Sequence, residues 1–274
     1  MKLKYLGTAA AEAFPALFCE CDNCKKARAA GGRNIRSRSQ AIVDNRLLLD
    51  FPGDTCWHAA QNRIDLLEVN HCLITHTHTD HFDPTDLSYT RLPFSYHPQD
   101  WTFTLWGSED LIPLLRDYPR TDDSPLRLRT VRPFEPFELD GYTVTALKAE
   151  HGTAHPCFYM ISDGEKTILY AHDTDFFPEE TWEYLTRVKP VFDLVSLDCT
   201  EGAFDSLPYK GHMCLGTNIA CRDRMKAEGF LRDDTILVLN HFSHNALQGV
   251  YEEFVPIARR HGFLVSYDGM EITL

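Results

Sequence analysis

Four side chains that commonly bind metal ions fall within six consecutive positions of the sequence. They are His76, His78, Asp80 and His81, in the order His-x-His-x-Asp-His. Residues two apart on an extended segment point the same way, so His76 and His78 can share one ion. A turn after them would carry Asp80 and His81 to a second ion. Imidazoles and carboxylates suit zinc, manganese and iron, and a pair of such ions about 3.5–4 Å apart activates water. A solvated loop or helix-capping groups are the alternative, but this density of ligands indicates metal.

A second group of ligands is formed by Cys19, Cys21 and Cys24, which supply three thiols from one short loop. The chain has nine cysteines in 274 residues, an odd number in a chain long enough to fold without disulfides, so clustered thiols indicate metal in a reducing compartment. A structural zinc needs four ligands, and His244, three residues after His241, is the attractive fourth. An iron–sulfur site or buried thiols could use similar spacing.

Strands and helices that must position these ligands alternate along the whole chain, without a repeat or a linker. Strands are predicted over 1–6, 71–75, 102–106, 142–147, 166–171, 194–198 and 235–240, and helices over 56–67, 108–118, 178–187, 213–228 and 246–260. Asp-Asn or Asp-Gly pairs at 44–45, 163–164 and 268–269 predict hairpins. Strands in two sets with helices between them indicate a layered α/β or α+β fold, here a single domain over 1–274.

The His-x-His-x-Asp-His pattern resembles the signature of the metallo-β-lactamase superfamily. The resemblance implies a four-layer αββα sandwich with a dinuclear metal site at one edge of its two sheets. It also implies further ligands at strand ends, and His151, Asp173 and His241 follow predicted strands in the expected order. Asp173 would bridge the two ions, where antibiotic-degrading members of the superfamily carry Cys, and this argues against β-lactamase chemistry.

The segments GTAAAEAFPALFCECDNC and HFSH narrow the resemblance to the cyclic-phosphate phosphodiesterases of the bacterial carbon–phosphorus lyase pathway and their relatives. That group implies a structural zinc held by Cys19, Cys21, Cys24 and His244, with the thiols on an N-terminal loop at 18–25. It implies that the paired site often works with manganese. Gly211-His212-Met213 resembles a motif of that group whose His contacts the scissile phosphate, so His212 is the expected proton donor. The alternative is that His212 is only a residue at the start of a helix.

Composition limits the classes of partner. Lys and Arg number 27 and Asp and Glu 40, so the formal net charge is −13 and a long nucleic acid is disfavoured. No apolar run approaches the roughly 20 residues that span a bilayer, and the start of the sequence has no apolar signal core, so we expect a cytoplasmic protein with no membrane partner. Two divalent ions would leave the site positive despite Asp80 and Asp173, which suits a small anionic phosphodiester. A homodimer is a general prior for such chains.

We therefore expect a metal-dependent phosphodiesterase that hydrolyses a small phosphodiester, such as a cyclic phosphate. Two catalytic divalent ions, manganese, zinc or iron, and one structural zinc would serve it, with Asp80 orienting the attacking water and His212 protonating the departing oxygen. A thioester or lactone hydrolase of the same fold, a tRNA-processing nuclease and a non-catalytic small-molecule carrier are the alternatives.

Several neighbouring residues have two interpretations. Asp50 is expected to orient a ligating His, His172 to be structural, and His155 to line the pocket or to replace His151 as a ligand. The remaining cysteines are expected in the core; they are Cys56, Cys72, Cys157, Cys199, Cys214 and Cys221. The basic segment 25–38 is either a solvated loop or a source of one or two Arg for a second phosphate, and an irregular loop over 83–100 would shape the pocket.

Overall fold

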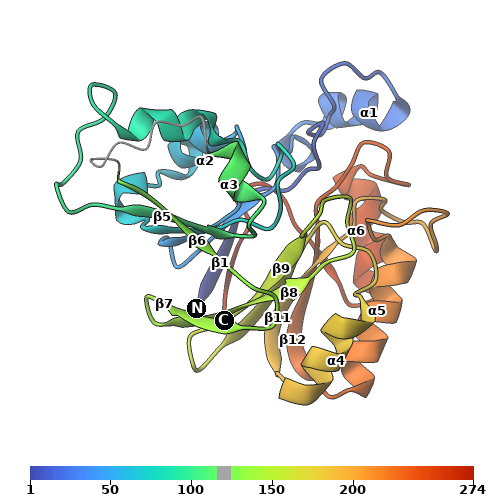
Figure 1. The fold of residues 1–274 in the computed structure, drawn as a ribbon. Helices are drawn as coiled ribbons and strands as arrows, with labels where there is room; N and C mark the ends of the chain where they lie inside the picture. The colour runs from blue at the N-terminus through green and yellow to red at the C-terminus, as the bar shows by residue number, and fades with distance from the viewer. Residues whose placement is uncertain (116–124) are drawn as a thin grey trace.

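The structure, a computed structural model, describes residues 1–115 and 125–274. The strands in these ranges form two seven-stranded sheets that face each other, with helices on the outer faces (Figure 1). The strand order is β14-β1-β2-β3-β4-β5-β6 in the first sheet and β13-β12-β11-β10-β9-β8-β7 in the second. The predicted four-layer αββα sandwich is confirmed.

The first sheet starts with a hairpin and continues with parallel strands. Its members are β1 (Lys2–Gly7), β2 (Gln40–Val43), β3 (Leu47–Leu49), β4 (His71–Leu73), β5 (Phe103–Gly107), β6 (Leu126–Thr130) and β14 (Glu271–Thr273). Strands β2 and β3 pair antiparallel around Asp44 and Asn45, whose φ angles of 49° and 58° suit a tight hairpin turn. Strands β3 to β6 are parallel, so their carboxyl ends share one edge of the sheet.

The second sheet has an antiparallel half and a parallel half. Its members are β7 (Pro136–Leu139), β8 (Tyr142–Lys148), β9 (Cys157–Ser162), β10 (Thr167–Ala171), β11 (Phe192–Asp198), β12 (Leu231–Asn240) and β13 (Leu264–Val265). The predicted turn at Asp163 and Gly164 joins β9 to its antiparallel partner β10. Strands β10 to β13 run parallel, which brings the carboxyl ends of β10, β11 and β12 together. Every residue of β11 is buried, as expected for a strand covered on both faces.

Helices complete the outer layers. They are α1 (Asp22–Ala30), α2 (Thr55–Asn62), α3 (Leu111–Leu114), α4 (Glu179–Val188), α5 (Leu215–Ala227) and α6 (Tyr251–Arg260). Helices α2 and α3 lie on the first sheet and α4, α5 and α6 on the second (Figure 1). Between the sheets, Leu3, Tyr5, Tyr159 and Tyr170 are fully buried. The Tyr5 hydroxyl donates to Ser196 Oγ at 2.8 Å and so ties one sheet to the other.

Some predicted elements are wrong or shorter than expected. The terminal hairpin at 268–269 does not form, because β13 belongs to the second sheet and β14 to the first, where it pairs with β1. Of the helix expected over 108–118, the structure shows Leu111–Leu114, and 116–118 lie outside the described residues. The irregular loop expected over 83–100 contains a 3₁₀ helix over Pro84–Thr90. Within the described ranges, no helix has the length and apolar character needed to cross a membrane.

Candidate metal centre

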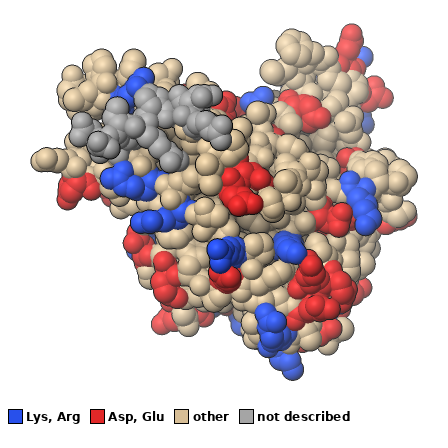
Figure 2. Space-filling model, viewed as in Figure 1, with Lys and Arg blue, Asp and Glu red and all other residues tan. Residues whose placement is uncertain are grey.

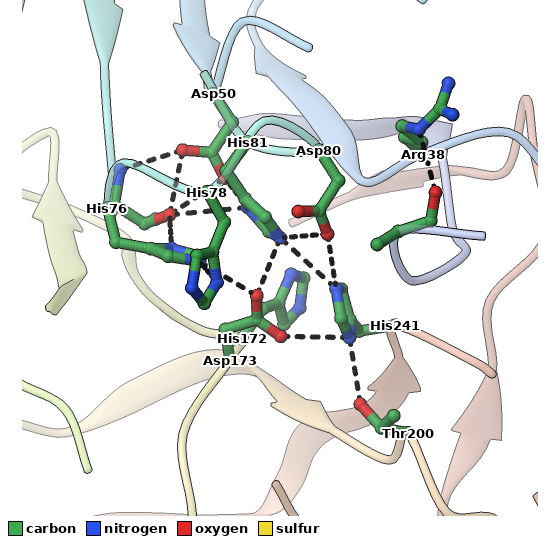
Figure 3. A network of polar contacts seen from close by, with 12 residues as sticks. Arg38, Asp50, His76, His78, Asp80, His81, His172, Asp173, Thr200 and His241 are labelled. Carbon is green, nitrogen blue, oxygen red and sulfur yellow. Dashed lines mark hydrogen bonds and ion pairs between the residues drawn. The ribbon is translucent and has the colours of Figure 1, made fainter. Parts of the chain in front are cut away.

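The His-x-His-x-Asp-His motif follows β4 and folds into a turn that is held at both ends (Figure 3). Asp50, just after β3, accepts hydrogen bonds from the Thr75 amide at 2.8 Å and from the Thr75 hydroxyl at 2.9 Å. At the other end, the amides of His81 and Phe82 donate to the His78 carbonyl at 3.0 and 2.8 Å. The side chains of the motif therefore project from a backbone that is fixed before any ligand binds.

The first donor set comprises His76, His78, His151 and Asp173, whose ligand atoms all lie within 4.8 Å of one another. His78 Nδ1 lies 3.1 Å from His76 Nε2 and 3.0 Å from His151 Nε2. Asp173 Oδ2 lies 3.2 Å from His76 Nε2 and 3.7 Å from His151 Nε2. The ends of β8 and β10 thus bring His151 and Asp173 to the motif from the opposite sheet.

The second donor set comprises Asp80, His81, Asp173 and His241, again within 4.8 Å. His81 Nε2 lies 2.8 Å from Asp173 Oδ2, 3.5 Å from Asp80 Oδ2 and 3.2 Å from His241 Nε2. The end of β12 supplies His241. Asp173 belongs to both sets, as expected of a bridging carboxylate.

The chemistry of both donor sets fits divalent ions. Ligand atoms about 2.0–2.2 Å from a tetrahedral ion stand about 3.3–3.6 Å apart, close to the separations within both sets. The outer nitrogens of three histidines face acceptors: His151 Nδ1 lies 2.9 Å from the Gly211 carbonyl, His81 Nδ1 2.7 Å from Asp50 Oδ2 and His76 Nδ1 3.0 Å from Thr75 Oγ1. A proton on each outer nitrogen leaves the Nε2 lone pair directed to the centre. The two sets therefore fit a dinuclear metal site.

Electrostatics at the centre also favour cations. Burial lowers the pKa of His76 to about 4, so its imidazole is neutral at pH 7. Burial of Asp173 would raise its pKa, but the charges of His241 and His81 hold that pKa well below its usual range. Burial would likewise lower the pKa of His81, yet Asp173, Asp50 and Asp80 raise it well above the usual value. Three carboxylates around one imidazole create a negative potential that a cation would neutralise.

Three residues of the centre adopt a left-handed backbone conformation. Asp50, Asp173 and His241 have φ angles of 67°, 51° and 65°, each at or just after the end of a strand. Non-glycine residues rarely adopt such angles, which cost about 1 kcal/mol or more and persist where the surrounding structure enforces them. The sheet edges therefore aim these side chains at the centre at the expense of local backbone energy.

His212 reaches the same centre from the segment before α5. Its Nδ1 lies 3.1 Å from Asp198 Oδ2, 3.1 Å from Thr200 Oγ1 and 3.5 Å from Asp173 Oδ1. Burial would lower the pKa of His212, but the Asp198 carboxylate and its hydrogen bond raise it to about 9. His212 therefore lies beside Asp173, the carboxylate that belongs to both donor sets.

Asp198, at the end of β11, was not predicted as a site residue. Its fully buried carboxylate accepts from the amides of Asp173, Thr200 and Met213 at 2.9–3.1 Å, as well as facing His212. One side chain thus joins the ends of β10 and β11 to the start of α5. The available signal was an acid at the end of a buried strand.

The N-terminal cysteines and His244 also meet. Cys19, Cys21, Cys24 and His244 place their ligand atoms within 4.8 Å of one another. His244 Nδ1 lies 3.3 Å from Cys19 Sγ and 3.7 Å from Cys21 Sγ, and the Asn23 amide donates to the His244 carbonyl at 3.0 Å. Burial alone would raise the pKa of the Cys21 thiol. Hydrogen bonds, of which the bond to His244 has the largest effect, lower this pKa to about 6. Because β12 ends at Asn240, its following loop carries both His241 and His244.

The secondary candidates have diverse surroundings. His155 is half exposed and its Nδ1 lies 3.0 Å from Asp110 Oδ1, away from both donor sets. His172 is buried with Nε2 2.7 Å from Ser196 Oγ, which fits the structural role predicted for it. Five of the six cysteines predicted in the core are buried, but Cys56 is exposed because it lies on the outer surface of α2.

The basic residues of 25–38 are engaged within the protein. Arg36 is only 2% exposed and donates to the Ser266 carbonyl at 2.7 Å. Arg38 pairs with Asp54 and donates from Nε to the Ala11 carbonyl at 2.9 Å. The other four also have partners: Lys25 pairs with Glu20, Lys26 with Glu253, Arg28 with the Cys19 carbonyl and Arg33 with the rings of Tyr251 and Tyr267. The first part of this segment is helix α1 and not a loop, but Lys25, Lys26, Arg28 and Arg33 are exposed, as expected of solvated residues.

A cavity of about 270 Å³ opens over the paired donor sets. Its walls include five residues of the two sets, together with His212 and Thr200. Three larger cavities, of about 720, 670 and 410 Å³, lie elsewhere, and the residues that line them belong to neither donor set. The cavity of about 270 Å³ is therefore the one that reaches the paired site.

An αββα sandwich with paired His and Asp donor sets at the sheet edges defines a metallo-β-lactamase fold. A family model described as "Beta-lactamase superfamily domain" matches residues 47–241, so the chain belongs to this superfamily. It is a metal-dependent hydrolase of that superfamily. No curated protein sequence matches the chain significantly.

Solved structures share this fold at low sequence identity. A diphosphatase from the PhnP family is 18% identical with a TM-score of 0.73, and the alignment covers 99% of this chain and 96% of that one. Zinc-bound PqqB from Methylobacterium extorquens is 20% identical with a TM-score of 0.74 and full coverage of both chains at 100%. The short form of human tRNase Z is 16% identical with a TM-score of 0.62, covering 100% of this chain and 99% of that one.

Proposed function

We propose that the protein is a phosphodiesterase that hydrolyses small phosphodiesters, cyclic phosphates included. The observation that carries the proposal is His212, a proton donor held beside the bridging Asp173 in the wall of the metal cavity. Cleavage of an unactivated phosphodiester releases an alkoxide, which needs a proton, and a histidine at this position can supply it. The names of two structures of the same fold, a diphosphatase and a tRNase, add support for phosphate chemistry.

His76, His78 and His151 would hold one catalytic ion, Asp80, His81 and His241 the other, and Asp173 both. Divalent ions bound there would polarise the phosphoryl oxygens and lower the pKa of a water molecule, which supplies the nucleophile at neutral pH. Zinc, manganese and iron all suit these ligands. Asp80, which is 5% exposed and lines the cavity, would also orient the water.

The chain itself handles the proton of the leaving group. Asp198 and Thr200 both face His212 Nδ1, so this nitrogen donates into the protein. Nε2 is then the nitrogen available to a substrate in the cavity. A protonated His212 donates from Nε2 to the departing oxygen, and Asp198 stabilises the imidazolium before the transfer.

Cys19, Cys21, Cys24 and His244 supply three sulfurs and one nitrogen, the ligands of a closed tetrahedral zinc site. We propose that one structural zinc binds there and fixes residues 18–25, which form a short loop and the start of α1 in place of the expected loop, to the loop after β12. All nine cysteines are free thiols, which supports a reducing, cytoplasmic location.

A substrate panel tests the proposed activity. The metal-loaded protein is assayed with bis(4-nitrophenyl) phosphate, a 2′,3′-cyclic nucleotide, a thioester and a lactone, with manganese and with zinc. Hydrolysis of the two phosphodiesters, and its loss in His76→Ala, is the expected result. Cleavage of the thioester or the lactone alone would overturn the proposal, as would full phosphodiester activity in His76→Ala.

A further inference from the structure

Building on the proposed phosphodiesterase activity, we propose that the site selects phosphodiesters whose ester groups carry no second phosphate, and that Glu12 and Glu201 impose this selection. Both residues line the cavity over the paired donor sets. Outside those sets the wall consists of neutral and acidic residues and His212. These residues are Ala10, Ala11, Glu12, Thr200, Glu201, Ser243 and Asn245. None of the described residues in the wall is Lys or Arg.

The turn that carries Glu12 is fixed to the rest of the protein. The Ala10 amide donates to the Phe242 carbonyl at 3.0 Å, and the Ala13 amide closes the turn by donating to the Ala10 carbonyl at 3.0 Å. Arg38 Nε donates to the Ala11 carbonyl at 2.9 Å. Glu12 is exposed and belongs to the residues that line the cavity.

Glu201 is fixed more deeply in the wall. Its side chain and backbone are only 9% exposed, and its carbonyl accepts a hydrogen bond from the Leu247 amide at 3.0 Å. Burial of Tyr209 and a hydrogen bond to Glu201 raise the pKa of Tyr209, so its hydroxyl stays protonated beside the carboxylate. Neither feature introduces a positive charge that would neutralise Glu201.

The charges of the cavity balance without a substrate. Two divalent ions contribute about +4, Asp80 and Asp173 about −2, and Glu12 and Glu201 about another −2. A phosphodiester adds a single negative charge, directly at the ions. A second phosphate adds about two more and would lie farther from the ions, on the side where the wall presents carboxylates.

Two arginines of segment 25–38 already have partners within the protein, although Arg38 makes one of its contacts with the wall residue Ala11. Arg36 is buried against Thr8 and Ser266, and Arg38 is paired with Asp54 and Ala11. On the face shown in Figure 2, Lys and Arg side chains stand next to acidic ones and do not gather into one broad patch. The hypothesis that segment 25–38 supplies an Arg to a second phosphate therefore gains no support from these contacts.

A matched pair of chromogenic diesters tests the inference. Thymidine 5′-(4-nitrophenyl phosphate) and the same compound with a 3′-phosphate differ only in the second phosphate. At low salt kcat/KM should be at least about tenfold higher for the first, and the ratio should shrink as salt screens the carboxylates. Glu12→Gln should lower the ratio of the two kcat/KM values about threefold to fivefold, and Glu12→Lys should lower this ratio further. Glu165→Gln, on the exposed β9–β10 turn, is the matched control and should leave the ratio unchanged.

Equilibrium binding gives a second measurement that does not depend on turnover. Calorimetry of the metal-loaded protein should show weaker binding of thymidine 3′,5′-bisphosphate than of thymidine 5′-phosphate, with the difference reduced in Glu12→Gln. Equal binding of the two nucleotides, or a kcat/KM ratio that Glu12→Lys does not change, would overturn the inference. Failure to hydrolyse either diester would instead refute the proposed activity, and calorimetry would still decide the charge selection.

Discussion

Replacing Asp198 by Asn should slow hydrolysis most for substrates whose leaving group most needs a proton. Asp198 Oδ2 lies 3.1 Å from His212 Nδ1, and the carboxylate is fully buried. Asn has nearly the same shape but no charge, and its NH₂ group can turn toward Nδ1. The variant therefore removes the charge-assisted hydrogen bond that holds the proton on Nδ1 and stabilises the imidazolium.

The size of the effect follows from that single bond. A hydrogen bond to a charged group contributes about 1.5–3 kcal/mol to the protonated form of His212, so its loss lowers the protonated fraction about 10- to 160-fold at a pH above both pKa values. The sign of the pH effect follows from the raised pKa of about 9 for His212. A general acid works while it is protonated, so activity is lost as pH rises through this pKa. Without Asp198 that loss should begin at lower pH.

The assay uses phosphodiesters that share one ester group and differ in the leaving group. A 4-nitrophenoxide departs without a proton, so its release should slow less than about fivefold, whereas an alkoxide substrate should show the full effect. Metal content is measured in each preparation. His212→Ala and the double variant complete a cycle in which Asp198→Asn should cost little once His212 is absent.

A uniform loss across the leaving groups would refute this reasoning. It would mean that Asp198 acts through the backbone amides of Asp173, Thr200 and Met213, and so through the shape of the centre. Additive effects of the two single variants with unchanged metal content would lead to the same conclusion.

Other predictions concern metal binding and stability. The His76→Ala variant should lose catalytic metal, and its activity should fall at least about 10³-fold. The control variant His155→Ala, at an exposed position, should keep its metal and its activity. Elemental analysis measures the metal content and a turnover assay measures the activity. Cys24→Ser should lower the zinc content by about one ion per chain and reduce the melting temperature, whereas Cys221→Ser should keep the zinc. The pKa of His58, lowered by burial to about 4, implies stability that is complete above pH 6.5 and is lost as pH falls toward 4. Between pH 6.5 and pH 4 the free energy of unfolding, measured with urea, should fall by about 3 kcal/mol because of His58. This contribution should be absent in the His58→Gln variant, and an equal fall in the variant would contradict the prediction.

The local part of the centre could be predicted from the sequence because its ligands are close along the chain. His76, His78, Asp80 and His81 share one turn, and their spacing limits how far apart they can lie. Strand ends at one edge of an α/β sheet converge, which is why the positions of Asp173 and His241 after predicted strands were informative. The alternation of elements indicated a layered α/β or α+β fold, and the resemblance to the metallo-β-lactamase superfamily implied the αββα sandwich.

Contacts between distant segments were outside the reach of local patterns. Asp198 is one of 40 acidic residues, and only the meeting of β10, β11 and the start of α5 distinguishes it from the others. The partners of Arg36 and Arg38 come from distant parts of the chain as well. The Asp268-Gly269 pair looked like a hairpin turn, yet Asp268 accepts from the Ser37 amide at 2.7 Å while the chain crosses from one sheet to the other.

The sequence by itself determined the types of ligand, their grouping into a His/Asp set and a Cys set, and the layered fold, because ligand type and hydrophobic period are written locally. Only the tertiary structure decided which acid holds His212, that Arg36 of the basic segment is buried, and which charges line the cavity. These properties depend on distances between strand ends and loops up to 200 or more residues apart, such as Ala10 and Phe242. Only the packing of both sheets fixes such distances.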